Sequence, residues 1–313
     1  MSRILVTGAT GFIGKHLIPE LISLGHKVIG AVRTYQEALK VEQIVVGDLE
    51  QLIDWTAFLH DVEIVIYLAA KVHVMETSLD TKNFCKVNTA PALHLAQQAA
   101  QCGVKRFIFM SSIKVNGEMT AEGSFFTEQQ EAIPTDPYGK SKYLAEQQLL
   151  ALSLNTTMDV VILRPSLVFG PGVKANFLKM MQLVNRGFPL PFSGINNKRT
   201  FVFIDNLISA VLAVLEDARA ANQIYIVSDD ESWSLPNLLA CIAQNMNKNP
   251  RLFKIPGLLF LFNLLGLSQI STRLLGSLEV SNNKIKNDLG WVPPVRSADG
   301  IARTVQWFVN EIN

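Results

Sequence analysis

Continuous apolar runs of four to six residues recur along the first half of the chain, separated by stretches whose apolar residues follow a helical period. They predict strands at 3–6, 27–32, 43–46, 63–68, 106–110 and 160–164. Runs without polar alternation are typical of strands buried on both faces, and helices between them indicate parallel pairing. The pattern therefore predicts an α/β fold with a doubly wound parallel sheet.

A glycine-rich turn follows the first predicted strand. Residues 7–14 read Thr-Gly-Ala-Thr-Gly-Phe-Ile-Gly, between that strand and a helix that continues to about Ser23. Glycines in this context let the backbone approach a pyrophosphate, which then meets the unpaired N–H groups of the helix N-terminus. The motif predicts a Rossmann-like dinucleotide site that includes Gly8, Gly11, Phe12, Ile13 and Gly14.

The residues after the second predicted strand bear on which dinucleotide binds. NAD sites commonly place an Asp or Glu there to hold the ribose 2′-hydroxyl, whereas this chain has Val32, Arg33 and Thr34. A guanidinium suits a 2′-phosphate, so NADP(H) is favoured and NAD(H) is the alternative. Other positions at or near the same edge that we expect to meet the cofactor are Asp48, Leu49, Leu68, Ala69, Ala70 and Pro165.

A hydroxyl, a phenol and an amine form the candidate catalytic group. Ser112 follows the fifth predicted strand, and Tyr138 and Lys142 open a helix on one shared face. A phenol with a pKa of about 10 is a poor base at neutral pH, but a nearby ammonium and a cationic nicotinamide favour the phenolate. The three residues predict proton transfer at an alcohol while a hydride moves.

After Gly172 the pattern is less regular. Helices are predicted at 176–186, 206–217, 235–247 and 297–311, and short strands near 200–204 and 223–227. We expect a dinucleotide-binding domain at 1–168, with 205–222 packing back on it, and an interleaved substrate lobe at 169–204 and 223–313. A diphosphate on the substrate would need one or two of the basic residues in this lobe.

The composition of the chain disfavours several classes of function. A net charge of +1 gives no electrostatic reason to expect nucleic acid as a partner. Three cysteines without a CxxC pair suit a cytoplasmic protein, and five histidines without metal-ligand spacing predict no metal site. No transmembrane segment is predicted, because the apolar stretch 255–267 is too short to span a bilayer; a buried helix is favoured there over peripheral membrane contact.

As a set, these motifs resemble those of the extended short-chain dehydrogenase/reductases. The likeness is strongest to UDP-sugar 4-epimerases and to nucleotide-sugar 4-keto reductases of bacterial surface-polysaccharide synthesis, the pathway class that includes lipopolysaccharide O-antigen. It covers nearly the whole chain: the glycine loop, Gly47-Asp48-Leu49, Leu68-Ala69-Ala70, Ser111-Ser112, Tyr138–Lys142, Arg164-Pro165 and Leu289-Gly290-Trp291.

The resemblance implies roles for the matched residues. Tyr138 is expected to be the acid/base, Lys142 to hold the nicotinamide ribose, and Ser112 to contact the substrate, while Asn88 helps to position the cofactor side. For the UDP-sugar substrate, the expected and candidate contacts are Lys71, His73, Lys114, Asn176, Arg199 and, as a looser match, Arg273. Family members dimerise through the helices that correspond to 80–102 and 137–152, so a homodimer is implied.

Departures from the family patterns separate the related reactions. Nucleotide-sugar 4,6-dehydratases carry an acidic pair after the hydroxyl residue, but Ile113 and Lys114 follow here, which disfavours a dehydratase. Epimerases usually have a small or hydroxyl residue at 114 and Tyr at 116, where this chain has Lys114 and Asn116. Together with Arg33, these residues favour reduction of a UDP-4-keto-6-deoxy-N-acetylhexosamine, as in UDP-N-acetylquinovosamine synthesis.

Two alternatives stay open at this point. One is a UDP-glucose or UDP-N-acetylglucosamine 4-epimerase with tightly bound NAD, which uses the same catalytic residues. The other, from a different class, is a cofactor-sensing protein that kept the fold without turnover. The intact set of Ser112, Tyr138 and Lys142 disfavours the second alternative.

Overall fold

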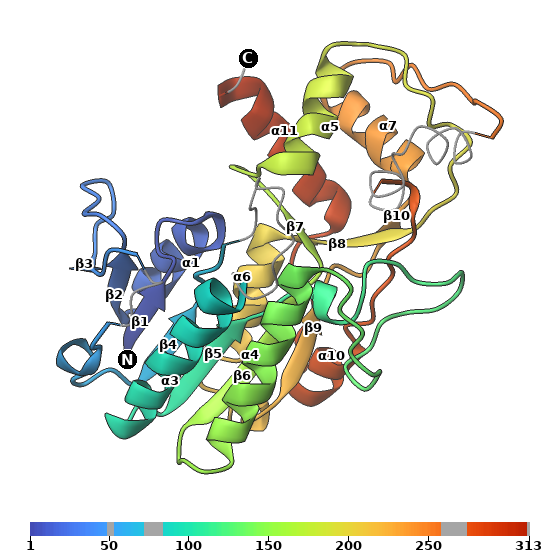
Figure 1. The fold of residues 1–313 in the computed structure, drawn as a ribbon. Coiled ribbons are helices and arrows are strands. Elements are labelled where there is room, and N and C mark those ends of the chain that lie inside the picture. The colour runs from blue at the N-terminus through green and yellow to red at the C-terminus, as the bar shows by residue number, and fades with distance from the viewer. Residues whose placement is uncertain (49–52, 72–83, 258–273, 312–313) are drawn as a thin grey trace.

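The computed structural model describes residues 1–48, 53–71, 84–257 and 274–311 (Figure 1). Seven strands form its main sheet, in the order β3-β2-β1-β4-β5-β6-β9, and every neighbouring pair is parallel. These strands are β1 (Arg3–Thr7), β2 (Lys27–Val32), β3 (Glu42–Val45), β4 (Ile64–Tyr67), β5 (Arg106–Met110), β6 (Asp159–Pro165) and β9 (Ile224–Val227). The strand order reverses between β1 and β4, which confirms the predicted doubly wound sheet.

The central strands are buried on both faces. In β1, Ile4 and Val6 pack into one apolar core, and Leu5 between them packs into another. Helices α1 (Phe12–Ser23) and α6 (Ile204–Ala213) border the first core, and α3 (Ala90–Gln101) and α4 (Pro137–Ser153) border the second. Because successive side chains of a strand point to opposite faces, two covered faces require uninterrupted apolar runs, as the sequence has.

A smaller sheet lies beyond the carboxyl ends of the main one. Its order is β10-β8-β7, with β7 (Leu167–Phe169), β8 (Arg199–Phe203) and β10 (Ser232–Trp233). Helices α5 (Ala175–Asn185), α7 (Leu235–Asn245) and α11 (Ser297–Glu311) gather around it at the top of Figure 1. Helix α10 (Asn283–Leu289) instead packs near β9. Within the described ranges, no helix combines the length and apolar composition needed to cross a bilayer.

Candidate active site

The glycine loop is shaped by close backbone contacts. Gly8 has a φ of +66°, and a Cβ there would lie 2.9 Å from the amide nitrogen of Ala69. A Cβ on Gly14 would lie 2.5 Å from the Gly8 carbonyl oxygen. The Thr7 hydroxyl accepts hydrogen bonds from the amides of Leu68 (3.2 Å) and Ala69 (3.3 Å), which ties the end of β4 to this loop. Only glycine fits these positions without a shift of the backbone.

The N-terminus of α1 fits an anion. No side chain caps the helix at Gly11, and its first turn, which begins with Phe12 and Ile13, contains no acidic residue. The first amides of a helix carry a partial positive charge and need acceptors, so they are suited to the pyrophosphate of a dinucleotide. The loop geometry and the uncapped helix together fit the expected cofactor.

The structure places several other predicted cofactor residues at or near the carboxyl ends of the strands. Arg33 follows β2 directly and is exposed, as is Asp48 beyond β3. Ala70, predicted for the cofactor, and Lys71, predicted for the substrate, are exposed after β4, whereas Pro165, the last residue of β6, is buried. The predicted contacts at Leu49, His73 and Arg273 lie outside the described residues.

Lys142 and Tyr138 meet at the carboxyl end of β5. Helix α4 begins at Pro137, and the Asp136 carboxylate caps it by accepting from the Gly139 amide at 2.9 Å. One turn later Lys142 is buried, and its Nζ donates to the Met110 carbonyl at 2.8 Å. The same Nζ lies 6.0 Å from the centre of the Tyr138 ring. The predicted pairing of amine and phenol is therefore present in the structure.

Ser112 reaches the same edge from the sheet. It follows β5 and caps a 3₁₀ turn at Ile113–Val115, where its Oγ accepts from the Lys114 amide at 3.3 Å. The carbonyl of Lys114 packs against the start of α4, since a Cβ on Gly139 would lie 2.6 Å from it. This close contact brings the turn that carries Ser112 against the helix that carries Tyr138.

The pKa values of Tyr138 and Lys142 differ from what the sequence led us to expect. Burial, and then the charge of Asp136, raise the pKa of Tyr138 above its usual value. Burial also lowers the pKa of Lys142 to about 7, against the opposing charge of Glu146. The expected lowering of the Tyr138 pKa by Lys142 is thus not seen, because the amine itself is desolvated and loses charge near neutral pH.

Behind the pair is a buried polar network that the sequence reasoning missed. Glu146 accepts from Nε of Arg164 at 3.0 Å and from the Ser111 hydroxyl, and Arg164 Nη1 donates to Asn116 Oδ1 at 3.0 Å. The network joins α4 to the ends of β5 and β6. One feature of the sequence could have indicated this network: Glu146 is four residues after Lys142 and so lies on the same face of the helix.

Asn88 connects the cofactor edge with α4. It lies in a π-helical turn at Cys85–Thr89, a conformation found disproportionately at functional sites. Its Oδ1 accepts from the Lys71 amide at 2.9 Å, and its Nδ2 donates to the Ser141 hydroxyl at 3.2 Å. Asn88 therefore links the segment after β4 to helix α4 by hydrogen bonds; its role in positioning the cofactor stays a prediction.

Lys114 takes part in ion pairs beside the phenol. Its Nζ lies 2.7 Å from Asp136, 3.4 Å from Glu118 and 6.0 Å from the centre of the Tyr138 ring. Burial alone would raise the pKa of Asp136, but hydrogen bonds from Lys114 and from the Gly139 amide hold it below its usual range. A residue proposed only for substrate contact is thus also part of the surroundings of Tyr138.

The substrate side contains a buried guanidinium. Arg199 begins β8, and its Nη1 donates to the Gly276 carbonyl at 2.9 Å. In the described part of the chain, its Nε is buried without a hydrogen-bond partner. Burial lowers the pKa of Arg199 to about 10, opposed by Glu118. Asn176 is exposed in the first turn of α5, directly after Ala175, whose φ is +55°.

Comparisons with known proteins agree with this arrangement. Residues 4–228 match the family described as NAD dependent epimerase/dehydratase. A UDP-glucose 4-epimerase of Vibrio cholerae is 40% identical over 319 residues, which cover 99% of this chain and 96% of the relative.

Two solved structures share the fold. The UDP-glucose 4-epimerase of Thermotoga maritima with UDP-glucose gives a TM-score of 0.80 at 24% identity, covering 99% of this chain and 100% of that one. MoeE5 in complex with UDP-glucose and NAD gives a TM-score of 0.80 at 22% identity, with 100% of both chains covered. At these identities, the two likenesses establish the architecture.

Proposed function

The chain belongs to the NAD dependent epimerase/dehydratase family, and from this premise we propose that it is a UDP-sugar 4-epimerase that retains its nicotinamide cofactor. The observation that carries the proposal is the position of Lys142 Nζ, 6.0 Å from the centre of the Tyr138 ring, at the edge where the glycine loop and Ser112 also lie. The sequence motifs favoured a 4-keto reductase. The similarity to the UDP-glucose 4-epimerase of Vibrio cholerae supports the epimerase alternative instead.

The glycine loop and the start of α1 are the proposed pyrophosphate site, with Lys142 and Asn88 placing the nicotinamide end. A nicotinamide held there would supply the hydride acceptor for one half of the reaction and the hydride donor for the other. The tight packing of Gly8 and Gly14 supports this assignment, because the absence of side chains there lets the loop turn closely from β1 into α1 and brings the start of the helix to the edge of the sheet.

Tyr138 is the proposed proton carrier. Its Oη takes the proton of the C4 hydroxyl as C4 is oxidised, and returns it to the C4 oxygen when the other face is reduced. Ser112 Oγ donates a hydrogen bond to that oxygen. Because burial raises the pKa of Tyr138, proton removal depends on positive charge next to the phenol. Lys114 and the protonated form of Lys142, each with its Nζ 6.0 Å from the ring centre, can supply that charge.

Arg199 is the proposed anchor for the diphosphate of the substrate. A buried guanidinium that lacks one hydrogen bond is suited to an anion, which supplies both the missing acceptor and the neutralising charge. Its place at the start of β8, beyond the end of the main sheet, supports a substrate that extends from Tyr138 into the smaller lobe. The division into a dinucleotide domain (1–168 with 205–222) and a substrate lobe is part of this proposal.

The test combines cofactor content with product analysis. The purified protein is expected to contain bound NAD(H) and to interconvert UDP-glucose and UDP-galactose, or their N-acetyl forms, without added cofactor. Tyr138→Phe should lower kcat by about a hundredfold or more, because general acid/base catalysis is lost, while the bound NAD(H) stays. Wild-type protein that binds NAD(H) and converts no UDP-sugar would contradict the proposal.

A second candidate, the 4-keto reductase, is supported by Arg33 at the end of β2, where no carboxylate is available for the ribose hydroxyl of NAD. Here Tyr138 donates its proton to the C4 oxygen as the keto group is reduced. This candidate predicts a protein purified without cofactor that consumes NADPH when given a UDP-4-keto-6-deoxy-N-acetylhexosamine. Cofactor content therefore separates the two candidates.

A further inference from the structure

Charge is distributed unevenly along the chain. Residues 171–204 and 232–278 contain none of its 27 acidic residues and nine of its 28 Lys and Arg residues. An even spread would place about seven carboxylates in those segments, so a chain with a net charge of +1 has one strongly basic part. Asymmetry of this kind indicates a polyanionic surface as partner, which the proposed epimerase reaction does not require.

Parts of the two segments lie side by side in the fold. The Leu190 amide donates to the Arg251 carbonyl at 2.8 Å, and the Phe253 amide donates to the Leu190 carbonyl at 3.0 Å. The Ser193 amide donates to the Phe253 carbonyl at 3.1 Å. Residues 188–193 and 251–254 therefore form a short ribbon, which follows α5 on one side and α7 on the other.

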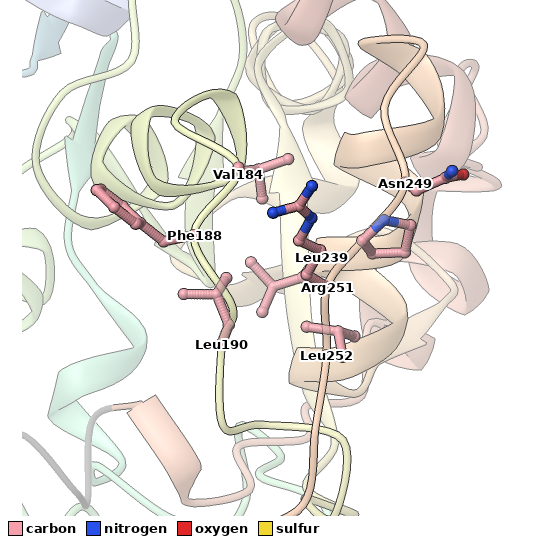
Figure 2. Close-up of a pocket in the computed structure, with 9 residues that line it drawn as sticks. Val184, Phe188, Leu190, Leu239, Asn249, Arg251 and Leu252 are labelled. Atoms are coloured by element: carbon pink, nitrogen blue, oxygen red, sulfur yellow. The ribbon is translucent and has the colours of Figure 1, made fainter.

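The ribbon borders a small pocket and also carries exposed rings. Leu190 and Leu252 line the pocket together with Val184 and Leu239, and Phe188 and Arg251 line it as well (Figure 2). Phe188 is 58% exposed and Phe253 is 44% exposed. Two phenyl rings at this exposure, on neighbouring strands, are not part of either core of the main sheet.

Exposed cations lie on the ribbon or next to it. Arg251 is exposed and lines the small pocket together with Phe188. The stem of Lys254 crosses the backbone of Gly194, where a Cβ would lie 2.9 Å from its Cγ. Lys248 is exposed and donates to Asn185 at the end of α5. We define the ribbon surface as Arg186, Phe188, Lys248, Arg251, Phe253 and Lys254.

We propose that the ribbon surface binds the headgroup layer of an anionic phospholipid bilayer. Each Lys or Arg brought close to such a layer strengthens binding about fivefold. Aromatic side chains are favoured at the boundary between headgroups and acyl chains. Rings and cations on one ribbon can satisfy both requirements at once, and this mixture favours a bilayer over a nucleic acid as the polyanion. The protein would then work at the membrane surface as a peripheral protein.

The test measures binding of the full chain to vesicles by flotation. We expect binding to phosphatidylcholine vesicles that contain phosphatidylglycerol, weak binding to pure phosphatidylcholine, and release as ionic strength rises. Arg251→Glu with Lys254→Glu should weaken binding at least about tenfold. Phe188→Ser with Phe253→Ser should weaken it severalfold while keeping the salt dependence.

A matched control changes the same net charge elsewhere. Lys27→Glu with Lys105→Glu alters exposed lysines at the opposite edge of the main sheet and should leave vesicle binding unchanged. Thermal unfolding midpoints of all variants, compared with the wild type, establish that the ribbon variants are folded. The proposal is overturned if folded wild type ignores anionic vesicles, if the control loses as much binding as the ribbon variants, or if single-stranded DNA binds and vesicles do not.

Discussion

At the scale of single residues, the charged groups around Tyr138 oppose one another in their effect on its proposed role as proton carrier. The Nζ atoms of Lys142 and Lys114 lie at the same 6.0 Å from the centre of its ring, although burial lowers the pKa of Lys142 to about 7. The Asp136 carboxylate opposes them and raises the pKa of the phenol. Since Asp136 is also the N-cap of α4 and the partner of Lys114, one side chain links helix geometry to phenol acidity.

These opposing charges lead to a pH prediction. We expect Asp136→Asn to move the rising limb of the pH–kcat profile to lower pH by roughly half a unit or more, because removal of a negative charge favours the phenolate. Asparagine is a good N-cap, so the helix should be retained. Lys114→Met should move the limb to higher pH, because it leaves the Asp136 carboxylate unpaired.

The control for this pair is Lys140→Met, an exposed position of α4 that should leave the profile unchanged. The limb is read from steady-state rates at saturating UDP-sugar, which separates an effect on Tyr138 from weaker substrate binding. Shifts of the two variants in the same direction would contradict the assigned charges.

Arg33 is the residue on which the prediction of NADP(H) rests. If it meets a ribose 2′-phosphate, Arg33→Ala should weaken NADPH binding by about tenfold or more and change NADH binding little. Titration of protein fluorescence with each nucleotide measures both. Lys27→Ala, at the far end of the same strand, is the matched control. Equal losses for the two nucleotides in Arg33→Ala would remove the argument for NADP(H).

At the scale of elements, the buried carboxylate of Asp229 joins strands and helices by hydrogen bonds near the boundary between the two lobes. Asp229 follows β9 and accepts from the Phe203 amide at 3.0 Å and from Nδ2 of Asn206 at 2.7 Å. Asn206 also accepts from the Val295 amide at 2.9 Å, so three distant segments meet here. Burial raises the pKa of Asp229 to about 6.

This shift predicts how stability changes with pH. Between about pH 4 and 6 the folded protein keeps a proton on Asp229 that the unfolded chain releases, so the contribution of this group falls as pH rises. The difference in unfolding free energy between wild type and Asp229→Asn should therefore decline by about 2 kcal/mol over that range. Urea unfolding at several pH values measures it, and a difference that grows with pH would refute the prediction.

Helices and strands that have a long periodic pattern or a recognisable motif in the sequence were predicted well. The glycine turn, α4 and α11 lie where their patterns put them, and every predicted strand is present within one or two residues. Strands β7 and β10 and the helix α10 were missed. Two or three strand residues are too few for a period, and α10 is only seven residues long, so packing rather than local pattern fixes these elements.

At the scale of the whole molecule, the faces of α3 and α4 opposite the sheet form a shallow groove. Its lining includes Cys85, Leu93, His94, Leu144 and Gln148, and Leu144 is 41% exposed. The resemblance to dimeric relatives implied these helices as an interface. We propose that a second copy of the chain covers the groove.

The dimer proposal has a direct test. Leu144→Arg should turn the dimer into a monomer in sedimentation velocity, because a charge would be buried at the centre of the interface. Leu154→Arg, an 85% exposed position just past the end of α4, should leave the dimer intact. A wild-type monomer at micromolar concentration would contradict the proposal.

The sequence by itself determined the parallel sheet, the glycine loop and the shared helix face of Tyr138 and Lys142, because the sequence pattern that indicates each one lies in residues a few positions apart. Only the tertiary structure decided which hydrogen-bond partners the residues of the site have and how acidic they are. The partners of Asn88 are 17 and 53 residues away, and Arg164 lies 18 residues from Glu146. Burial and the charge of Asp136 then set the acidity of Tyr138. Desolvation and long-range ion pairs depend on which distant segments pack together in the folded chain. A local sequence pattern does not contain that information.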